Sequence, residues 1–476
     1  MRIVADLHIH SKYSRAVSPE MLPETLDAWA DDKGITVMGT GDFTHPLWLA
    51  ELQKKLAPAE PGLFALKKQF KQKTLKGTFA TATRFLLTEE ISCIYSRAGR
   101  TRRVHHLIFA PDFATVEKIN TALGRIGNLK SDGRPIIGID SEDLLKIVLE
   151  CNPSTRPSSK TSAGAASSGH NGAVLVPAHI WTPWFSVFGS MSGFDSLDEC
   201  FGDYAKHIFA VETGLSSDPP MNWRMSALDH VALISNSDSH SLQRIGREAN
   251  IFDTELSYDG IVEAMKSGRP LSPRHPDPAT AGEGSRARRE ILRRPLAAQN
   301  DIGGKFLGTI EFFPEEGRYH YDGHRLCGIM WTPEETKKHS GICPKCGQKV
   351  TVGVLNRVAG LADRKEGYRD ARRPPYWNLV PLDEIIGEAL DVGPKSKAVQ
   401  KEYQKLIVAF GSELAASLDV SIPKLATVAM PEVAEGIERM RSGKVSITPG
   451  YDGEYGIVKM FSAKDRKRHE QQSKLF

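Results

Sequence analysis

The feature that most constrains this chain is an ordered series of histidines and carboxylates that directly follow short apolar stretches. The series opens at residues 6–10 (Asp-Leu-His-Ile-His) and closes at residues 237–240 (Ser-Asp-Ser-His). Strand side chains alternate between two faces, so His-x-His places both imidazoles on one face. Imidazole with carboxylate suits zinc, manganese or iron, and several such ligands indicate a multinuclear metal site. The candidates are His8, His10, Asp42, His45, Glu89 or Glu90, His105 or His106, His179, Glu212, Asp238 and His240.

Short apolar strands alternate with helical stretches through the first 272 residues, for example at 3–5 and 231–234. Such alternation favours a parallel sheet or a (β/α) barrel whose site lies at the C-terminal ends of the strands. Two stretches, residues 152–172 and 273–304, are rich in Ser, Gly, Pro or Arg and cannot bury a core. We predict a disordered insertion at the first and a linker at the second.

Composition and charge narrow the class of protein. The 476 residues, 40% hydrophobic and 25% charged, are typical of a soluble globular protein with several domains. A net charge of +4 permits nucleic-acid binding without requiring it. No apolar run approaches the roughly 20 residues of a membrane helix, so no membrane contact is expected. The chain enters a strand at once, which predicts no signal peptide, and its cysteine usage fits a reducing cytoplasm.

A second metal site is predicted from the cysteine spacing. His324 and Cys327 form one pair of ligands, and Cys343 and Cys346 form another within a Cys-Pro-x-Cys-Gly turn. Two such knuckles are typical of a closed tetrahedral zinc site, which is structural because four protein ligands leave no open position. Two other histidines compete with His324 for the fourth place. They are His320 and His339.

The C-terminal third reads as helical, because apolar residues recur at helical spacing through residues 380–445. Within it, Lys395, Ser396 and Lys397 lie at a turn that enters a helix, where free amides and lysines could hold a DNA phosphate. An ordinary helix start with proline near its N-cap is the equal alternative.

Two further patterns predict contacts with partners. The aromatic run 179–188 follows a candidate ligand, and Trp181 and Trp184 could stack on a flipped base, with core packing as the alternative. The chain ends with Gln472, Leu475 and Phe476 after a polar, basic tail. This ending is similar to the Gln-x-x-Leu-Phe peptide that docks bacterial repair proteins on the replication sliding clamp, although a five-residue match can arise by chance.

The ligand series resembles that of the PHP (polymerase and histidinol phosphatase) superfamily of metal-dependent phosphoesterases. This resemblance rests on residues 6–11, 90–91, 105, 178–179 and 238–240. Together with the His/Cys segment, residues 308–317, 353–355, 392–396 and 449–456 are similar to the endonuclease Q family. The likeness covers nearly the whole chain apart from the two low-complexity stretches. Enzymes of that family nick DNA on the 5′ side of uracil, hypoxanthine, xanthine or an abasic site, leaving a 3′-hydroxyl and a 5′-phosphate.

The resemblance implies an α/β fold: a distorted (β/α) PHP-type barrel, then a small zinc-binding module and a helical C-terminal domain. It implies a metal-dependent DNA repair endonuclease whose partner is DNA with deaminated bases or abasic sites. A phosphoesterase for a small phosphorylated metabolite and a 3′–5′ exonuclease stay as alternatives. The expected boundaries are 1–272 for the catalytic domain, 305–375 for the zinc module, 376–462 for a mainly helical DNA-binding domain with terminal strands, and 463–476 for a flexible tail.

The resemblance also implies roles for single residues. His8, His10, Glu90 and Asp238 would serve one metal, with Glu90 bridging to a second held by His105 and His179. Glu90 is preferred to Glu89 because it precedes the apolar Ile91. The remaining superfamily positions are occupied by His240 and Glu212.

Two positions depart from the superfamily pattern. Arg15 and Phe43 stand where it often has metal ligands, which weakens a third site unless Asp42 and His45 substitute. We therefore expect two or three divalent ions, zinc, manganese or magnesium. We also expect Asp238 to orient the attacking water and Arg15 to offset charge at the phosphate.

Overall fold

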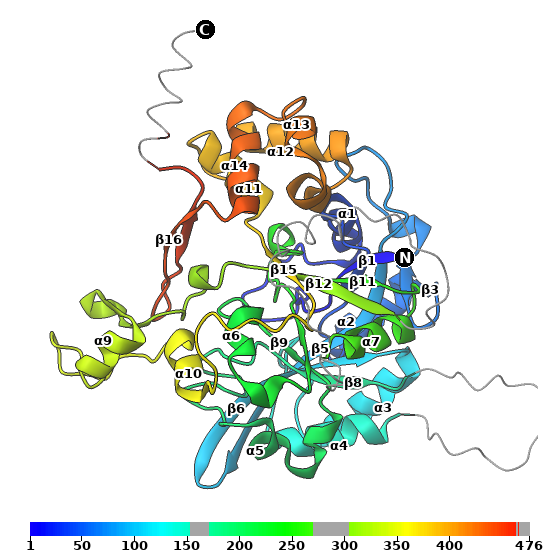
Figure 1. Cartoon of the computed structure of the whole chain (residues 1–476). Coiled ribbons are helices and arrows are strands. Elements are labelled where there is room, and N and C mark those ends of the chain that lie inside the picture. Colours follow the sequence, from blue (N-terminus) through cyan, green and yellow to red (C-terminus); the bar gives the residue numbers. More distant parts are fainter. Residues whose placement is uncertain (153–170, 270–303, 463–464, 466–476) are drawn as a thin grey trace, which may run out of the picture.

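A computed structural model describes residues 1–152, 171–269, 304–462 and 465 (Figure 1). At its centre lies one large sheet with the strand order β15-β12-β11-β1-β2-β5-β4-β3. In that order the strands are Tyr376–Asn378, Lys305–Glu311, Ala249–Asp253, Arg2–Asp6, Val37–Gly39, Arg84–Arg97, Phe64–Leu66 and Leu56–Pro58. From β5 the sheet branches to β6 (Arg100–Ala110), β7 (Ile136–Ile137) and β8 (Val174–Pro177). A separate parallel pair consists of β9 (Ala210–Glu212) and β10 (Ala232–Ile234).

The sheet is mixed, whereas the sequence favoured a parallel one. Strands β1, β2 and β5 do run parallel, and the helix α1 (Pro23–Lys33) connects the first two. Strand β6 runs antiparallel because it follows β5 through a two-residue turn at Ala98 and Gly99. Both turn residues have positive φ, 53° and 72°, which is the conformation of tight hairpin turns. The predicted α/β class is therefore confirmed, in a mixed form.

Strand β1 is buried on both faces, which explains its continuous apolar sequence. Ile3 and Ala5 contribute to one hydrophobic cluster of the core, and Val4 contributes to the other. Helices cover the sheet and its branch; figure 1 shows α3 and α4 below it and α7 at one side. Their bounds are α2 Pro46–Lys55, α3 Phe113–Leu123, α4 Ser141–Glu150, α5 Leu197–Phe201, α6 Pro219–Trp223 and α7 Tyr258–Ser267.

The segment with the predicted zinc ligands is built from small elements: β13 (Asp322–His324), β14 (Ile329–Trp331), α9 (Pro333–Lys338) and α10 (Val354–Leu361). The central sheet continues past the boundaries expected at 305 and 376. Strand β12 pairs with β11, and β15 pairs with β12. A strand's own sequence does not specify its neighbour, so these two strands could not be assigned to the sheet from sequence.

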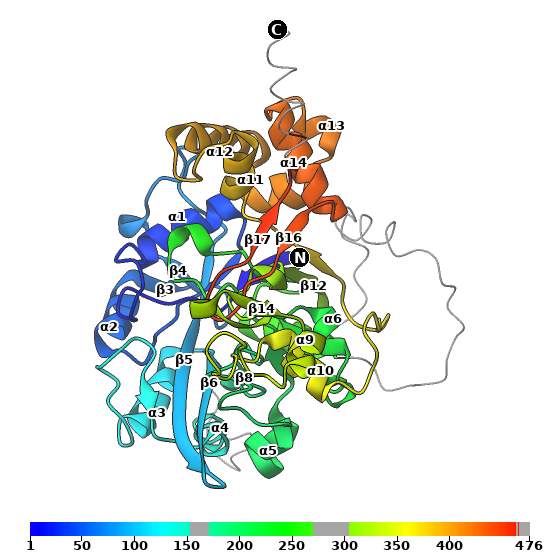
Figure 2. The ribbon, with the colours of Figure 1, turned by 90° about the vertical axis from the view of Figure 1, so that its left-hand side faces the viewer.

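The C-terminal third is helical, as predicted. It contains α11 (Leu382–Ala389), α12 (Lys397–Phe410), α13 (Ile422–Leu425) and α14 (Pro431–Ser442). The two terminal strands, β16 (Ser446–Thr448) and β17 (Ile457–Lys459), form a hairpin that runs from these helices to the zinc-ligand segment (Figure 2). Residues 449–456 between them form a turn. Three glycines loosen this stretch, and the amides of Gly450 and Gly456 donate to the carbonyls of Glu315 and Glu316.

Several predictions of the sequence fall outside the described residues. The expected insertion and linker do so almost wholly, and the expected tail does so apart from Asp465. The predicted clamp-binding residues Gln472, Leu475 and Phe476 lie there as well. Among the residues that the structure describes, no helix combines the length and hydrophobicity needed to cross a membrane.

Candidate active site

Two triads of potential metal ligands lie together, carried by the strands and by the loops that follow them. The first consists of His8 and His10, directly after β1, and Asp238, which follows β10. The second consists of Glu90 on β5, His105 on β6 and His179, which follows β8. Within each triad the ligand atoms lie within 4.8 Å of one another. The structure thus brings together six of the residues that the sequence singled out.

Glu90 links the two triads through its two oxygens. Oε1 lies 2.8 Å from Nδ1 of His105 and 3.0 Å from Nε2 of His179. Oε2 lies 3.3 Å from Nε2 of His10. Asp238 completes the first triad, with Oδ1 at 3.2 Å from Nε2 of His10 and 3.6 Å from Nε2 of His8. A carboxylate in this position can bridge two cations.

The electrostatics of the triads fit bound cations. Nε2 of His8 is buried and has no hydrogen-bond partner, yet it lies 3.6 Å from carboxylate oxygens of both Glu90 and Asp238. Burial alone would lower the pKa of His8, but Glu212, Glu90 and Asp238 outweigh it and hold that pKa well above its usual value. An orphaned imidazole nitrogen among carboxylates is the arrangement that a divalent ion satisfies.

Asp42 and Glu212, also predicted as ligands, stand behind the two triads rather than in them. Asp42 lies 3.1 Å from Nδ1 of His10 and accepts hydrogen bonds from Ser11. Glu212 lies 3.1 Å from Nδ1 of His8 and accepts from the backbone amide of His179. Carboxylates on the far nitrogen of a metal-ligating histidine fix its tautomer and orientation. These two residues have the position for that role.

His45, His240 and Arg15 also lie outside the two triads. The ring of His45 stacks on Tyr13 at 4.3 Å between ring centroids, and its role as a third-site ligand stays a prediction. His240 packs beside His10 at 4.7 Å between ring centroids, and its Nδ1 lies 3.0 Å from the carbonyl oxygen of Asp238. Arg15 is exposed at the rim.

Arg134 is the cation at the site that sequence reasoning missed. Its Nη1 donates to Oε2 of Glu90 at 2.9 Å, and its side chain is 25% exposed. Burial would lower the pKa of Arg134, but Glu90 and Asp238 outweigh burial and hold that pKa above its usual value. The preceding Gly133 packs so tightly that an added Cβ would lie 2.2 Å from a carboxylate oxygen of Asp42. No motif in the sequence marks this loop, since its link to β5 arises only from the fold.

The aromatic run beyond β8 divides between core and surface. Trp181 is buried at 1% exposure, donates to Oδ1 of Asn222 at 2.7 Å and packs on Phe188, so the prediction that it stacks on a DNA base is wrong. Trp184 is partly exposed and packs edge-on against Tyr319 at 5.7 Å. It remains available at the surface for such a contact.

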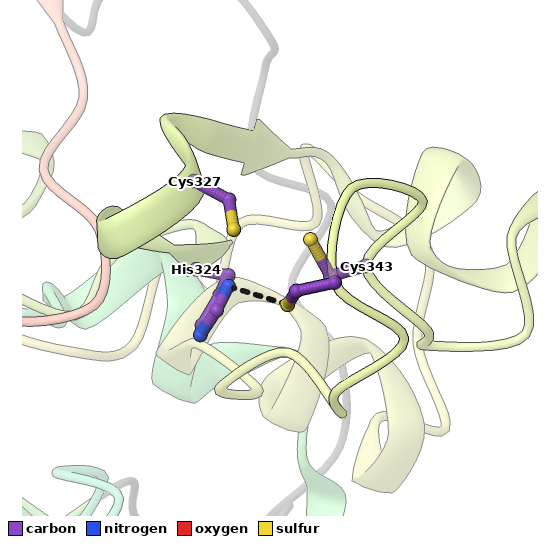
Figure 3. Close-up of side chains that lie close together, drawn as sticks. His324, Cys327 and Cys343 are labelled. Atoms are coloured by element: carbon purple, nitrogen blue, oxygen red, sulfur yellow. Dashed lines mark hydrogen bonds between the residues drawn. The ribbon is translucent and has the colours of Figure 1, made fainter.

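A cluster of zinc-type donors lies apart from the triads (Figure 3). His324, Cys327, Cys343 and Cys346 have their ligand atoms within 4.8 Å of one another, and Nδ1 of His324 lies 3.5 Å from Sγ of Cys346. The two rival histidines are engaged elsewhere, since His320 is buried against Tyr321 and His339 stacks on Trp331. This donor set matches a closed structural zinc site.

The proposed phosphate turn before α12 is exposed at Lys395 and Lys397. Ser396 caps the helix, and its Oγ accepts from the amide of Val399 at 3.3 Å. The cap therefore satisfies one helix amide from within the chain, and the lysines are left as the available cations of this turn.

Comparison with known proteins identifies relatives of the C-terminal region, of about three fifths of the chain, and of nearly the whole chain. A family model described as the MJ0043 C-terminal domain matches residues 381–444. The MJ0043 protein of Methanocaldococcus jannaschii is 33% identical over 282 residues, 59% of this chain and 31% of that protein, so the chain spans about a third of that relative's length. The YqxK protein of Bacillus subtilis is 27% identical over 467 residues, 96% of this chain and 99% of that one.

Two solved structures match nearly the whole chain. The lesion-specific endonuclease PfuEndoQ from Pyrococcus furiosus has 29% identity and a TM-score of 0.75, over 98% of this chain and 99% of that one. Endonuclease Q in complex with a 27-mer duplex substrate, with an abasic lesion at its active site, has the same identity and TM-score over 98% of both chains. The match runs through the sheet, the zinc-type cluster and the helical region. The chain therefore closely resembles endonuclease Q in structure along nearly its whole length.

Proposed function

We propose that this protein is a metal-dependent DNA repair endonuclease that cuts the phosphodiester on the 5′ side of a deaminated base or an abasic site. The observation that carries the proposal is the pair of triads joined by Glu90, with Oε1 turned to His105 and His179 and Oε2 to His10. The relatives support it, since one is a lesion-specific endonuclease and another holds abasic DNA. The products would carry a 3′-hydroxyl and a 5′-phosphate.

His8, His10 and Asp238 would hold one divalent ion, and His105 and His179 a second, with Glu90 shared between them. Divalent ions at such a pair of sites supply an activated water and offset the charge that develops on the phosphate. Zinc, manganese and magnesium all accept these ligands, and zinc is the ion proposed for the separate His/Cys cluster.

Asp238 is placed to handle the proton of the attacking water. One of its oxygens contacts His8 and His10, and its side chain is 26% exposed toward solvent. Burial would raise the pKa of Asp238, but His8, His10 and His240 outweigh it and hold that pKa well below its usual value. The carboxylate is therefore ionised at neutral pH and can orient and accept from a water. Arg247 steadies this loop by donating to the carbonyl of Ser237 at 2.9 Å.

The chain also supplies fixed positive charge for the phosphate. Arg134 reaches the bridging Glu90 from the rim, where its remaining donors can meet a non-bridging phosphate oxygen. Flipping a base out of the duplex would bring the neighbouring phosphate close to Arg134. The free-energy cost of flipping is lowest where the base is unpaired or missing.

A nicking assay tests the proposal against its two alternatives. The substrates are end-labelled duplexes that each carry one uracil, hypoxanthine, xanthine or abasic site, a lesion-free duplex, and a small sugar phosphate. We expect one cut immediately 5′ of each accepted lesion, with an end that a polymerase can extend, and Asp238→Asn should bind the same duplexes without cutting them. Release of phosphate from the sugar would favour the small-molecule phosphoesterase, and progressive shortening from the 3′ end would favour the exonuclease.

A further inference from the structure

Leu326 is the most exposed large apolar side chain in the described parts of the chain, at 86%. A single exposed leucine is ordinary on a protein surface, so its setting decides whether it matters. The setting here is the tip of the first knuckle of the His/Cys cluster, between His324 and Cys327.

The knuckle holds Leu326 in a fixed place. Its backbone forms one turn of 3₁₀ helix, Arg325–Cys327, bounded by two candidate metal ligands: His324 at the N-cap and Cys327 as the last residue. The amide of Arg325 donates to a carboxylate oxygen of Asp452 at 2.7 Å. The carbonyl of Cys327 accepts from Nζ of Lys345 at 2.6 Å. Leu326 is thus presented by a braced loop.

The same knuckle is fastened to the C-terminal hairpin. Asp452, in the turn between β16 and β17, also accepts from Oγ1 of Thr351 at 2.6 Å, which binds the turn to the zinc-ligand segment. Figure 2 shows β14, β16 and β17 together on one face of the molecule.

A chain of ring contacts runs from this segment to the second triad. Tyr319 packs against Trp184 at 5.7 Å, and the next residue, Phe185, packs on His105 at 4.7 Å between ring centroids. The segment that carries the knuckle therefore contacts the loop that follows His179 of the second triad.

Two exposed cations lie next to the leucine, one of which, Arg325, is also 3.8 Å from Glu454. Arg325 precedes it in the chain, and Lys345 is anchored to Cys327 beside it. The segment also exposes Arg318, Lys337, Lys338 and Lys349. An apolar tip with cations on both sides is complementary to duplex DNA, which has an anionic exterior and an apolar base stack.

We propose that Leu326 is a wedge that enters the base stack of duplex DNA at the lesion, while Arg325 and Lys345 contact the flanking phosphates. The inference rests on the proposed function. Proteins that distort DNA insert apolar side chains between base steps. A side chain that fills the gap left by an everted base lowers the free energy of the flipped state. The substrate class that depends on this residue is therefore a lesion within intact, paired duplex.

Single-turnover cleavage of paired and unpaired lesions tests the wedge. Leu326→Ala should cut uracil in a fully paired duplex about tenfold more slowly than wild type, because the flipped state is less stable. On the same strand with the uracil in an unpaired bubble, the two proteins should agree within about twofold, since no stacked pair has to be opened. Val408→Ala, which removes another exposed aliphatic side chain on α12 at 58% exposure, is the matched control and should match wild type on both substrates.

A fluorescence measurement separates the wedge from a merely structural role. With 2-aminopurine beside the lesion, Asp238→Asn should raise the fluorescence on binding because the neighbouring base unstacks, and Asp238→Asn with Leu326→Ala should raise it far less. Equal slowing on paired and bubble substrates, or equal fluorescence in the two proteins, would overturn the wedge. If the wild-type protein cuts no lesion duplex, the proposed function itself fails. If it does cut, and Leu326→Ala changes the rate equally on paired and bubble substrates, only the wedge proposal fails.

Discussion

At the scale of single residues, Arg134 allows a specific test of the proposed site. It is paired with the carboxylate that joins the triads, and its partly exposed fork faces the rim. Arg134→Gln should lower the rate of cutting about a hundredfold, comparable to the loss of one pre-organised donor to a developing oxyanion. Arg134→Lys should retain part of the rate, since it keeps the charge and loses the planar fork.

Two comparisons make the Arg134 prediction decisive. Elemental analysis should show an unchanged metal content in Arg134→Gln, because arginine is not a ligand. Arg15→Gln is the matched control, and its exposed side chain should cost at most about threefold in rate. A larger loss in Arg15→Gln than in Arg134→Gln would restore our first expectation, in which Arg15 serves the phosphate.

The sequence identified the residues of the two triads better than the residues that support them. His-x-His at the end of an apolar strand and Asp-Ser-His after another carry their own geometry, because strand alternation fixes the faces. Asp42 and Glu212 share the same residue types and positions after strands, yet they lie behind His10 and His8. Whether a carboxylate meets a metal or the far nitrogen of a histidine depends on distances of a few ångströms, which sequence spacing does not encode. The burial of Trp181 likewise depends on side-chain packing, which sequence spacing does not encode.

At the scale of elements, the His/Cys cluster should support its small segment. The nearby core is slight, since Trp331, Cys343 and Val350 form a cluster of their own. Cys346→Ser should reduce the metal content by about one zinc per chain and lower the melting temperature, because bound zinc supplies folding free energy that so small a core lacks. Cys200→Ser changes a buried cysteine outside the cluster and should leave the zinc content unchanged. An unchanged zinc content in Cys346→Ser would refute the site.

A buried glutamate makes the join between β12 and the β9–β10 pair sensitive to pH. Glu311 accepts from the hydroxyls of Thr213 and Ser235, each at 3.1 Å, and burial raises its pKa from an ordinary 4.5 to about 8. The unfolded chain ionises this carboxyl well below the pH at which the folded chain does. The free energy of unfolding should therefore fall as pH rises from about 5 to 8 and level off above that.

Thermal unfolding across this range checks the effect. Glu311→Gln keeps the shape of the side chain without a titrating proton, so its melting temperature should decline less between pH 5 and pH 8 than that of wild type. Buried Glu248 next to it also has a raised pKa, so a part of the decline should remain. Identical curves for wild type and Glu311→Gln would contradict the assignment.

Whether a segment is a helix or a strand was easier to predict from sequence than which strands pair with one another. The helical spacing of residues 380–445 and the apolar strands at 3–5 and 231–234 were read correctly because periodicity is local. The β5–β6 hairpin, which makes the sheet mixed, depends on a turn at Ala98 and Gly99 that is easily overlooked. The turn at 449–456 has a docking contact with Glu315 and Glu316 that sequence alone does not reveal.

At the scale of the whole molecule, recruitment is a separate question from chemistry. The last five residues resemble a sliding-clamp peptide and lie outside the described residues. Burying Leu475 and Phe476 in a partner could supply about 3–6 kcal/mol before ordering costs, which corresponds to a weak contact. Deleting residues 472–476 should leave nicking of naked oligonucleotides unchanged and abolish heat of binding to a bacterial clamp in calorimetry. Equal heats for the full and shortened chains would eliminate the clamp hypothesis.

The whole-molecule arrangement explains why residues scattered from 8 to 238 form one site. The loops after β1, β8 and β10 and the middle parts of β5 and β6 bring their ligands together, and the β16–β17 hairpin connects the C-terminal helices with the zinc-ligand segment (Figure 2). The sequence predicted this convergence in outline, because parallel strands share an edge. It could not predict that the zinc-ligand segment would be fastened to this hairpin, since that depends on contacts such as Arg325 with Asp452.

The central claim is that two divalent ions are held between the triads with Glu90 bridging them. Anomalous X-ray scattering from crystals soaked in manganese tests it most directly. The account predicts two ions about 3.5–4 Å apart, one beside His8, His10 and Asp238, the other beside His105 and His179, with an oxygen of Glu90 on each. A single ion, or a pair that leaves Glu90 unbound, would contradict the account.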